Sequence, residues 1–262
     1  MKIAYLGIDL LRCALEAALA EGCEVLRLFS CETDNVTEFN TAVLSAARDR
    51  GIPVTLSPIT KTDLAQLAAQ GCQLLLCAGY YHKVPVTDDF PMVNLHPAPL
   101  PRFRGAWPMP CMLLRGEAEG GVVLHKMARD FDAGDILLET SFPLSPADTL
   151  KDYMAKTEEA APGLVSRLIR ELPALLELAR PQGAGTYWPC PTEADWTVTP
   201  EMTAEAADRV LRAFFGYECV YRSGDRRFEL IGGRAVAGAE SPFPVRGGAI
   251  LARSARELEA YV

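Results

Sequence analysis

Apolar and polar positions follow two alternating periods over residues 1–78. Strands are expected at residues 2–8, 23–30, 52–57 and 72–78. The last of these is almost continuously apolar, as expected for a strand that is covered on both faces of a sheet. The segments between these strands carry apolar residues at helical spacing and end at Gly22, Gly51 and Gly71, and Asp9 is expected to cap the first helix. This alternation predicts an α/β fold built on a mostly parallel, doubly wound sheet.

The pattern continues along the rest of the chain with longer connections. Further strands are expected near residues 92–95, 120–127 and 136–142, with helices near 106–116 and 200–214. A helix should open at Ser145-Pro146, kink or break at Pro162-Gly163 and end by Pro173, because proline lacks the amide hydrogen that a helix interior needs. Beyond the last predicted helix, short strands are expected to be joined at Ser223-Gly224-Asp225 and at Gly232-Gly233.

These segments predict three parts of the chain. Residues 1–180 form a main α/β domain, residues 181–197 are a linker rich in proline and glycine, and residues 198–262 form a small α+β or β-rich domain. No run approaches the roughly 18 apolar residues of a membrane span, and the start has no signal-peptide pattern. We therefore expect a soluble, cytoplasmic protein with no membrane partner.

Composition narrows the chemistry. The eight cysteines lack the spacing of a metal knuckle and several lie in apolar runs, so buried thiols are expected. Three dispersed histidines complete no first shell of ligands, and no metal is expected. Gly7 alone follows the first strand where a dinucleotide site carries three spaced glycines, which disfavours NAD or FAD. The net charge of −8 works against unaided attraction to a polyanion.

The segment from Asn94 to Gly105, Asn-Leu-His-Pro-Ala-Pro-Leu-Pro-Arg-Phe-Arg-Gly, is the strongest candidate for chemistry. Alternate residues of a strand share one face, so Asn94 and His96 are expected to project together at the end of the strand. Ligands of doubly wound sheets bind beyond the carboxyl ends of the strands. The segment therefore lies in a suitable place for a site.

Three motifs in this order resemble the folate-dependent formyltransferase superfamily: Gly79-Tyr-Tyr-His-Lys-Val-Pro85, the segment from Asn94 to Gly105, and Asp132-Ala-Gly-Asp135. The resemblance covers roughly residues 1–200. It implies a Rossmann-like fold, 10-formyltetrahydrofolate as the formyl donor, and Asn94, His96 and Asp132 as the catalytic residues. Within this superfamily, the chain resembles both the sugar N-formyltransferase and the methionyl-tRNA formyltransferase branches.

The implied reaction explains these residue types. An amine attacks the formyl carbon, and the carbonyl oxygen becomes an oxyanion that the Asn94 amide and the His96 ring would meet with N–H donors. Asp132, or less plausibly its neighbours Asp130 and Asp135, would move the proton. An adjacent carboxylate is expected to favour a charged His96.

The resemblance also implies binding residues. The folate pocket would be formed by Gly79, Tyr80, Tyr81, His82, Val84, Asp130 and Phe131. The acceptor would be bound by Arg104 and Gly105. Two alternatives stay open at this point: Tyr80 and Tyr81 either line the pterin or belong to the core, and His125 either packs in the core or supports the Asp132 loop.

The acceptor is inferred from features that the chain lacks. Residues 198–262 hold nine Arg, no Lys and nine Asp or Glu, so they are neutral where a tRNA-binding surface should be basic. Ile8-Asp9-Leu10 replaces the phosphate loop that glycinamide ribonucleotide formyltransferases carry. A nucleotide-linked amino sugar is the leading acceptor, and methionyl-tRNA, another small amine or a catalytically silent folate-binding role are the alternatives. The sugar branch implies a homodimer.

Overall fold

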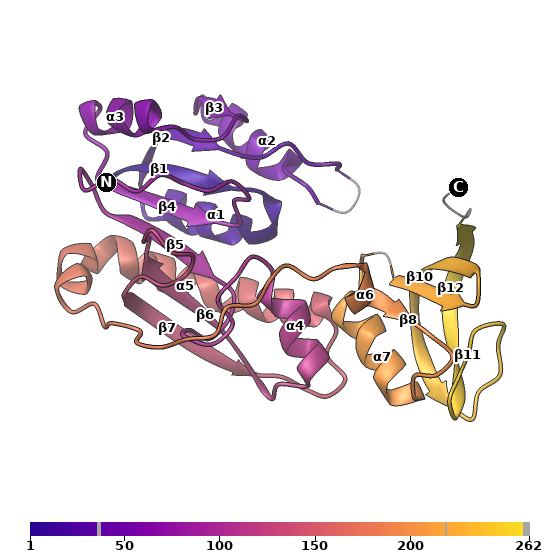
Figure 1. The fold of residues 1–262 in the computed structure, drawn as a ribbon. Helices are drawn as coiled ribbons and strands as arrows, with labels where there is room; N and C mark the ends of the chain where they lie inside the picture. The colour runs from indigo at the N-terminus through magenta and orange to yellow at the C-terminus, as the bar shows by residue number, and fades with distance from the viewer. Residues whose placement is uncertain (36–37, 218, 259–262) are drawn as a thin grey trace. The chain divides into compact units, whose positions relative to one another are not determined.

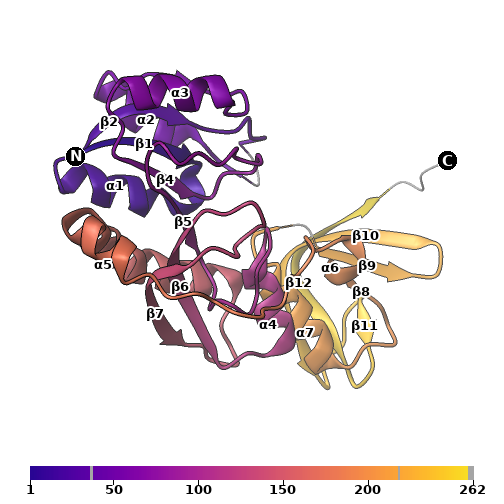
Figure 2. The same ribbon diagram turned by 60° about the vertical axis from the view of Figure 1, so that its left-hand side comes forward.

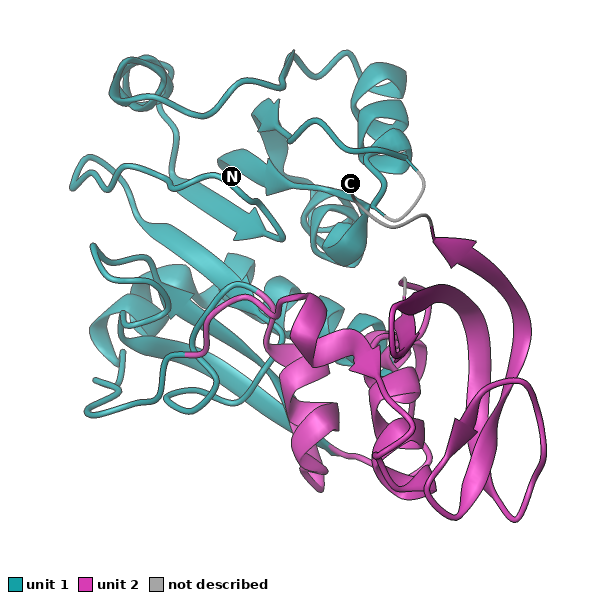
Figure 3. Cartoon of the chain, turned by 45° about the vertical axis from the view of Figure 1, so that its right-hand side comes forward, with its two compact units in different colours: residues 1–106, 121–142, 156–187 teal, residues 107–120, 143–155, 188–262 magenta. Residues whose placement is uncertain are grey.

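The computed structural model describes residues 1–35, 38–217 and 219–258, and its contacts divide the chain into two compact units. Unit 1 comprises residues 1–106, 121–142 and 156–187. Unit 2 comprises residues 107–120, 143–155 and 188–262 (Figure 3). The two units are therefore interleaved in sequence, because unit 2 includes two short segments from within residues 1–180.

Unit 1 is built around a seven-stranded sheet of order β3-β2-β1-β4-β5-β6-β7 (Figure 1). Its strands are β1 Lys2–Gly7, β2 Glu24–Phe29, β3 Val54–Thr55, β4 Leu74–Ala78, β5 Met92–His96, β6 Glu119–Lys126 and β7 Ile136–Pro143. The first five in this order pair in parallel, and β6 is antiparallel to β5. The predicted α/β class and mostly parallel sheet are confirmed.

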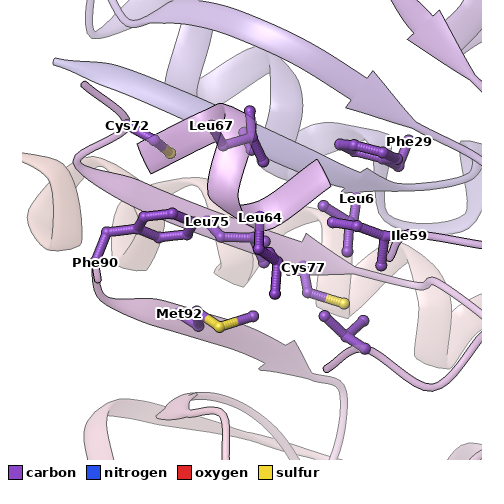
Figure 4. Packing of buried hydrophobic residues seen from close by; sticks show 12 residues of the cluster. Leu6, Phe29, Ile59, Leu64, Leu67, Cys72, Leu75, Cys77, Phe90 and Met92 are labelled. Atoms are coloured by element: carbon purple, nitrogen blue, oxygen red, sulfur yellow. The ribbon is translucent and has the colours of Figure 1, made fainter. Parts of the chain in front are cut away.

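Helices cover both faces of this sheet. They are η1 Asp9–Leu11, α1 Arg12–Ala20, α2 Thr41–Asp49, α3 Lys61–Ala69 and α5 Leu150–Glu177, while α4 Pro108–Arg115 lies in unit 2. Successive residues of β1 point to opposite faces: Leu6 packs in the cluster beneath α3, and the buried Tyr5 donates its hydroxyl to the Leu11 carbonyl at the start of α1. Figure 4 shows the cluster on the α3 side, which joins Leu64 and Leu67 of α3 to Leu75 of β4 and Met92 of β5.

Asp9 caps a different helix from the one expected. Its carboxylate accepts hydrogen bonds from the amides of Ala42 and Val43, at 2.9 and 2.8 Å, in the first turn of α2. The nearer helix α1 begins at Arg12 without a side-chain cap. The prediction that Asp9 caps the helix following the first strand is wrong, because the η1 turn directs its side chain toward the second helix.

The long helix α5 continues through Pro162 and Pro173, so the predicted end by Pro173 and the alternative of a break at Pro162-Gly163 are wrong (Figure 2). The alternative of a kink at Pro162-Gly163 stays a prediction. The helix begins after Thr149, which exchanges hydrogen bonds with Asp152, instead of at Ser145-Pro146. A stripe with helical spacing is buried along it: Ala161, Val165, Leu168, Leu172 and Leu175. Burial of this stripe outweighs the cost of two prolines, about 3 kcal/mol each in a helix interior.

Unit 2 contains a five-stranded sheet of order β11-β12-β10-β9-β8 with α7 packed on β10 and β12. Its elements from residue 188 onward are α6 Glu193–Trp196, β8 Thr197–Val198, α7 Ala204–Ala213, β9 Cys219–Ser223, β10 Arg226–Ala237, β11 Pro244–Val245 and β12 Gly248–Leu258. The turn at Gly224-Asp225 joins β9 to β10 as expected, since Ser223 pairs with Arg226.

Gly232-Gly233 does not join two strands, as predicted, but lies inside β10. Gly232 has a φ of 61°, and a Cβ on Gly233 would approach the Leu251 carbonyl oxygen to 2.8 Å. Glycine is therefore needed for a close approach of β10 to β12 and not for a turn.

Across the described residues, no helix is both long enough and apolar enough to cross a membrane.

Two glycines with open space around them should respond oppositely to alanine. Gly163 lies inside α5, where alanine is favoured by about 0.5–1 kcal/mol, whereas Gly51 has a φ of 65° that strains any side chain. We expect Gly163→Ala to raise the urea midpoint of unit 1 and Gly51→Ala to lower it, as followed by circular dichroism. Equal shifts for both variants would contradict this account.

Candidate active site

Four polar side chains converge at the carboxyl end of β5. Asn94 and His96 share one face of this strand, as its alternation predicts, and the antiparallel pairing of β6 places His125 opposite Asn94. The Asn94 Nδ2 atom lies 3.1 Å from His125 Nε2 and 3.3 Å from Asp132 Oδ1. The structure thus brings the three predicted catalytic residues together and adds His125 to them.

Asp132 lies at the centre of this cluster, with its side chain 11% exposed. Its Oδ1 atom is 3.3 Å from His125 Nε2 and 3.7 Å from His96 Nδ1, and its Oδ2 atom accepts a hydrogen bond from the Gly105 amide at 2.9 Å. Of the two rival carboxylates, Asp135 pairs with Lys126 and Asp130 is exposed. Only Asp132 among them faces the histidines.

The backbone around Asp132 explains the Asp-Ala-Gly sequence. Asp132 has a φ of 52°, in the left-handed region that non-glycine residues rarely adopt. A Cβ on Gly134 would lie 1.9 Å from the Lys126 carbonyl oxygen, so only glycine fits there. This tight turn directs the carboxylate back toward β5 and β6.

Backbone carbonyls fix the orientation of both imidazole rings. A carbonyl oxygen only accepts, so His96 Nε2 donates to the Phe103 carbonyl and His125 Nδ1 donates to the Lys126 carbonyl, both at 2.8 Å. The second nitrogen of each ring then faces the Asp132 carboxylate. In neutral rings these second nitrogens are proton acceptors, and the Asn94 amide donates to His125 and to Asp132.

Burial controls the charge of this cluster. Burial lowers the pKa of His96 below its ordinary value and outweighs the Asp132 charge, which acts to raise it. Asp132 therefore acts on His96 in the expected direction, but burial has the larger effect and the net shift of the His96 pKa is downward. Burial also acts to raise the pKa of Asp132, but His96, His125 and the Gly105 amide lower it to about 2. The Asn94 side chain and the Gly105 main chain also donate hydrogen bonds to this carboxylate.

The segment predicted to line the folate pocket has mixed surroundings. The Tyr80 hydroxyl accepts from the Ile59 amide at 3.1 Å and its ring packs against the core, whereas Tyr81 is 47% exposed and donates to Glu38 at 2.6 Å. His82 meets the edge of Tyr80, with ring centroids 5.4 Å apart. Val84 is buried in the core, so its contribution to a pocket would be through the main chain.

The remaining predicted residues lie on the loops beside the cluster. Phe131 is 56% exposed, and the Lys83 ammonium lies 5.7 Å from its ring centroid, which joins the loop of residues 130–131 to the segment of residues 79–84. Gly79 has a φ of 72° and its carbonyl accepts from Ile8. Roles of these residues in binding folate stay predictions.

Two residues of the site were not assigned to it from the sequence. His125 was left between packing and support, and the pairing of Asn94 with His125 across β5 and β6 decides for the cluster. Gln182 lies in the predicted linker, yet it accepts from Arg104 and donates to the Asp132 carbonyl. No local pattern marks Gln182, because its partners are distant in sequence.

In the described ranges, no group of three or more His, Cys, Asp or Glu side chains has the arrangement of a metal site.

The lowered pKa of Asp132 predicts a pH-dependent contribution to stability. The pKa falls from an ordinary value of 3.8 to about 2, so the carboxylate stabilises the fold fully above about pH 4 and loses this effect as pH falls through about 2. The free energy of unfolding of the natural chain should lose about 2 kcal/mol over this window relative to Asp132→Asn. The free energy of unfolding of both proteins would be measured by urea titration at each pH. The same pH dependence in the two proteins would contradict this prediction.

Comparison with known proteins shows what the part of the chain that carries this site is similar to. The formyl transferase family matches residues 54–169, which include the whole cluster. Methionyl-tRNA formyltransferase from Dechloromonas aromatica (strain RCB) is 33% identical over 181 residues. The match covers 66% of this chain and 58% of that protein, so the chain matches little more than half the length of this curated relative.

Two solved structures share the fold at low sequence identity. A 4-N formyltransferase from Francisella tularensis has a TM-score of 0.69 and 16% identity, with 100% of this chain and 98% of that chain covered. An N-formyltransferase from Helicobacter canadensis, in complex with folinic acid and dTDP-3-aminofucose, has a TM-score of 0.66 and 17% identity, with 96% and 98% covered. Both therefore extend the likeness over unit 2.

Proposed function

We propose that the chain is a formyltransferase, which transfers a formyl group from 10-formyltetrahydrofolate to the amino group of a nucleotide-linked amino sugar. The match to the formyl transferase family over residues 54–169 supports this proposal. The observation that carries this proposal is the cluster of Asn94, His96, His125 and Asp132 at the end of β5. It combines an amide donor, proton acceptors and an ionised carboxylate within one nearly buried site.

In the proposed reaction the neutral amine of the acceptor attacks the formyl carbon and forms the new C–N bond. The carbonyl oxygen becomes an oxyanion, which an N–H of Asn94 stabilises. The ammonium proton passes to the His96 and Asp132 pair, either of which presents an acceptor atom, and the folate nitrogen takes up a proton as its own C–N bond breaks. Asn94 donates to His125 and to Asp132 in the structure, so one of these N–H groups would turn to the oxyanion as it forms.

The charge distribution of residues 198–262 supports a small acceptor. Six of the nine arginines form ion pairs with nearby carboxylates: Arg209, Arg212, Arg226, Arg227, Arg234 and Arg256. A surface that binds tRNA needs cations that are free to meet phosphates. The neighbour from Helicobacter canadensis, whose structure holds folinic acid and a dTDP-amino sugar, agrees in fold with this proposal.

Methionyl-tRNA is the second candidate acceptor, and the 33% identity to a methionyl-tRNA formyltransferase favours it. The two candidates are separated by one assay. The purified chain is given 10-formyltetrahydrofolate with either a panel of nucleotide-linked amino sugars or charged initiator tRNA, and tetrahydrofolate release is followed. We expect release with an amino sugar. Release of tetrahydrofolate with the tRNA and with no amino sugar would contradict the proposed acceptor. Release with neither substrate would contradict the proposal of formyl transfer.

The roles of Asn94 and His96 predict a specific kinetic result. Loss of one oxyanion donor or proton acceptor in a preorganised site costs about 10²–10³ in kcat. We expect Asn94→Ala and His96→Ala each to reduce kcat by this factor with little change in folate affinity, measured by fluorescence titration. The exposed α3 variant Gln66→Ala is the control with unchanged kcat. Near-normal turnover in either site variant would contradict its role.

A further inference from the structure

The segment of residues 180–187 lies against the site although the sequence marks it as a linker. At one end, Arg180 and Ile136 exchange main-chain hydrogen bonds of 2.9 and 2.8 Å at the start of β7. At the other end, the Thr186 amide donates to the Pro101 carbonyl at 3.1 Å, and the Arg104 amide donates to the Thr186 carbonyl at 3.0 Å. The segment therefore bridges the loop that follows β5 and the loop that carries Asp132.

Gln182 makes the central contacts of this bridge. Its Oε1 atom accepts from Arg104 Nε at 3.1 Å and from Arg104 Nη2 at 2.9 Å. Because the guanidinium only donates, the amide oxygen must face Arg104 and the NH2 group must face the opposite way. That NH2 group donates to the main-chain carbonyls of Asp132, at 2.8 Å, and of Gly134, at 2.5 Å.

These two carbonyls belong to the turn whose backbone is the most constrained in the site. Asp132 has a φ of 52°, and Gly134 lies too close to the Lys126 carbonyl to carry a side chain. A left-handed conformation persists only where the surroundings hold it. Gln182 supplies this restraint through the main chain, and the Gly105 amide, which follows Arg104, supplies a second one through the Asp132 carboxylate.

We propose that Gln182, oriented by Arg104, is a positioning residue that holds the Asp132 turn and thereby aims the Asp132 carboxylate at Asn94, His96 and His125. The inference rests on the proposed function, because it assigns a role in formyl transfer. It also gives Arg104 a different role from the predicted one, since the Nε and Nη2 atoms of its guanidinium bind Gln182 and the Gly183 carbonyl.

The kinetic test compares Gln182→Ala and Gln182→Glu with the control Gln66→Ala. The glutamate variant keeps a partner for Arg104 but turns a carboxylate oxygen toward two carbonyls, so both Gln182 variants lose the donor. A displacement of about 1 Å at a reacting group costs about 10²-fold. We expect each to lower kcat by about 10- to 100-fold, with KM for donor and acceptor changed less than about two-fold.

A double variant separates positioning from a general structural role. If Gln182 acts through Asp132, Gln182→Ala should cause no further loss of kcat when it is added to Asp132→Asn. An undiminished second loss, or a kcat of Gln182→Ala equal to that of the natural chain, would overturn the proposal. A third result would also count against the proposal. If both Gln182 variants melted at a lower temperature and changed KM as much as kcat, the substitutions would have caused a general loss of structure.

A measurement without substrate keeps this inference distinct from the proposed function. The chain has three histidines, so their ring proton signals can be followed separately by NMR, with His82→Gln for assignment. The groups that face His96 are Asp132, His125 and the Phe103 carbonyl. We expect the His96 titration to move to lower pH by about half a unit or more in Gln182→Ala, in the direction that Asp132→Asn also causes.

An unchanged His96 titration in Gln182→Ala would overturn the positioning role even in an active enzyme. Absence of formyl transfer in the natural chain, with the expected shift of the titration, would overturn the proposed function and leave the positioning of Asp132 by Gln182 standing.

Discussion

The placement of one carboxylate, that of Asp132, is the constraint on which the rest of the site depends. An ionised carboxylate that is largely removed from water costs several kcal/mol unless donors replace the lost hydration. Here the donors come from separate parts of the chain, the Asn94 amide on β5 and the Gly105 main chain, and two imidazole rings flank the carboxylate. A shift of the Asp132 turn would leave a buried charge without partners, which ties this loop to the sheet.

Burial also sets the direction in which protons can move. Each ring uses one nitrogen to hold a backbone carbonyl, so neither His96 nor His125 can turn over without losing a hydrogen bond. With its pKa lowered by burial, His96 presents an unprotonated nitrogen to Asp132 near neutral pH. The resting site is therefore able to accept the proton that an attacking amine must lose, which agrees with the order of steps proposed for formyl transfer.

Much of the fold could be predicted from local patterns, and the errors have physical causes. Strands β1, β2, β4 and β5 lie within two residues of their predicted bounds, since each is marked by a local run of apolar residues. The prediction of a break in α5 was wrong because it considered only the local cost of proline in a helix. The buried stripe that stabilises α5 depends on tertiary packing, which the local pattern does not show. Asp9 caps α2 for the same reason, because its carboxylate reaches across to residues 42 and 43.

By itself, the sequence determined the α/β class and the shared face of Asn94 and His96, because each depends on residues close together in the chain or on burial. Only the tertiary structure decided that His125 joins the cluster, that burial lowers the pKa of His96, and that Gln182 contacts the Asp132 turn. These properties arise from antiparallel pairing, desolvation and contacts between segments about 30 to 80 residues apart. No local pattern encodes such distances, so the electrostatics of the site became defined only when the chain had folded.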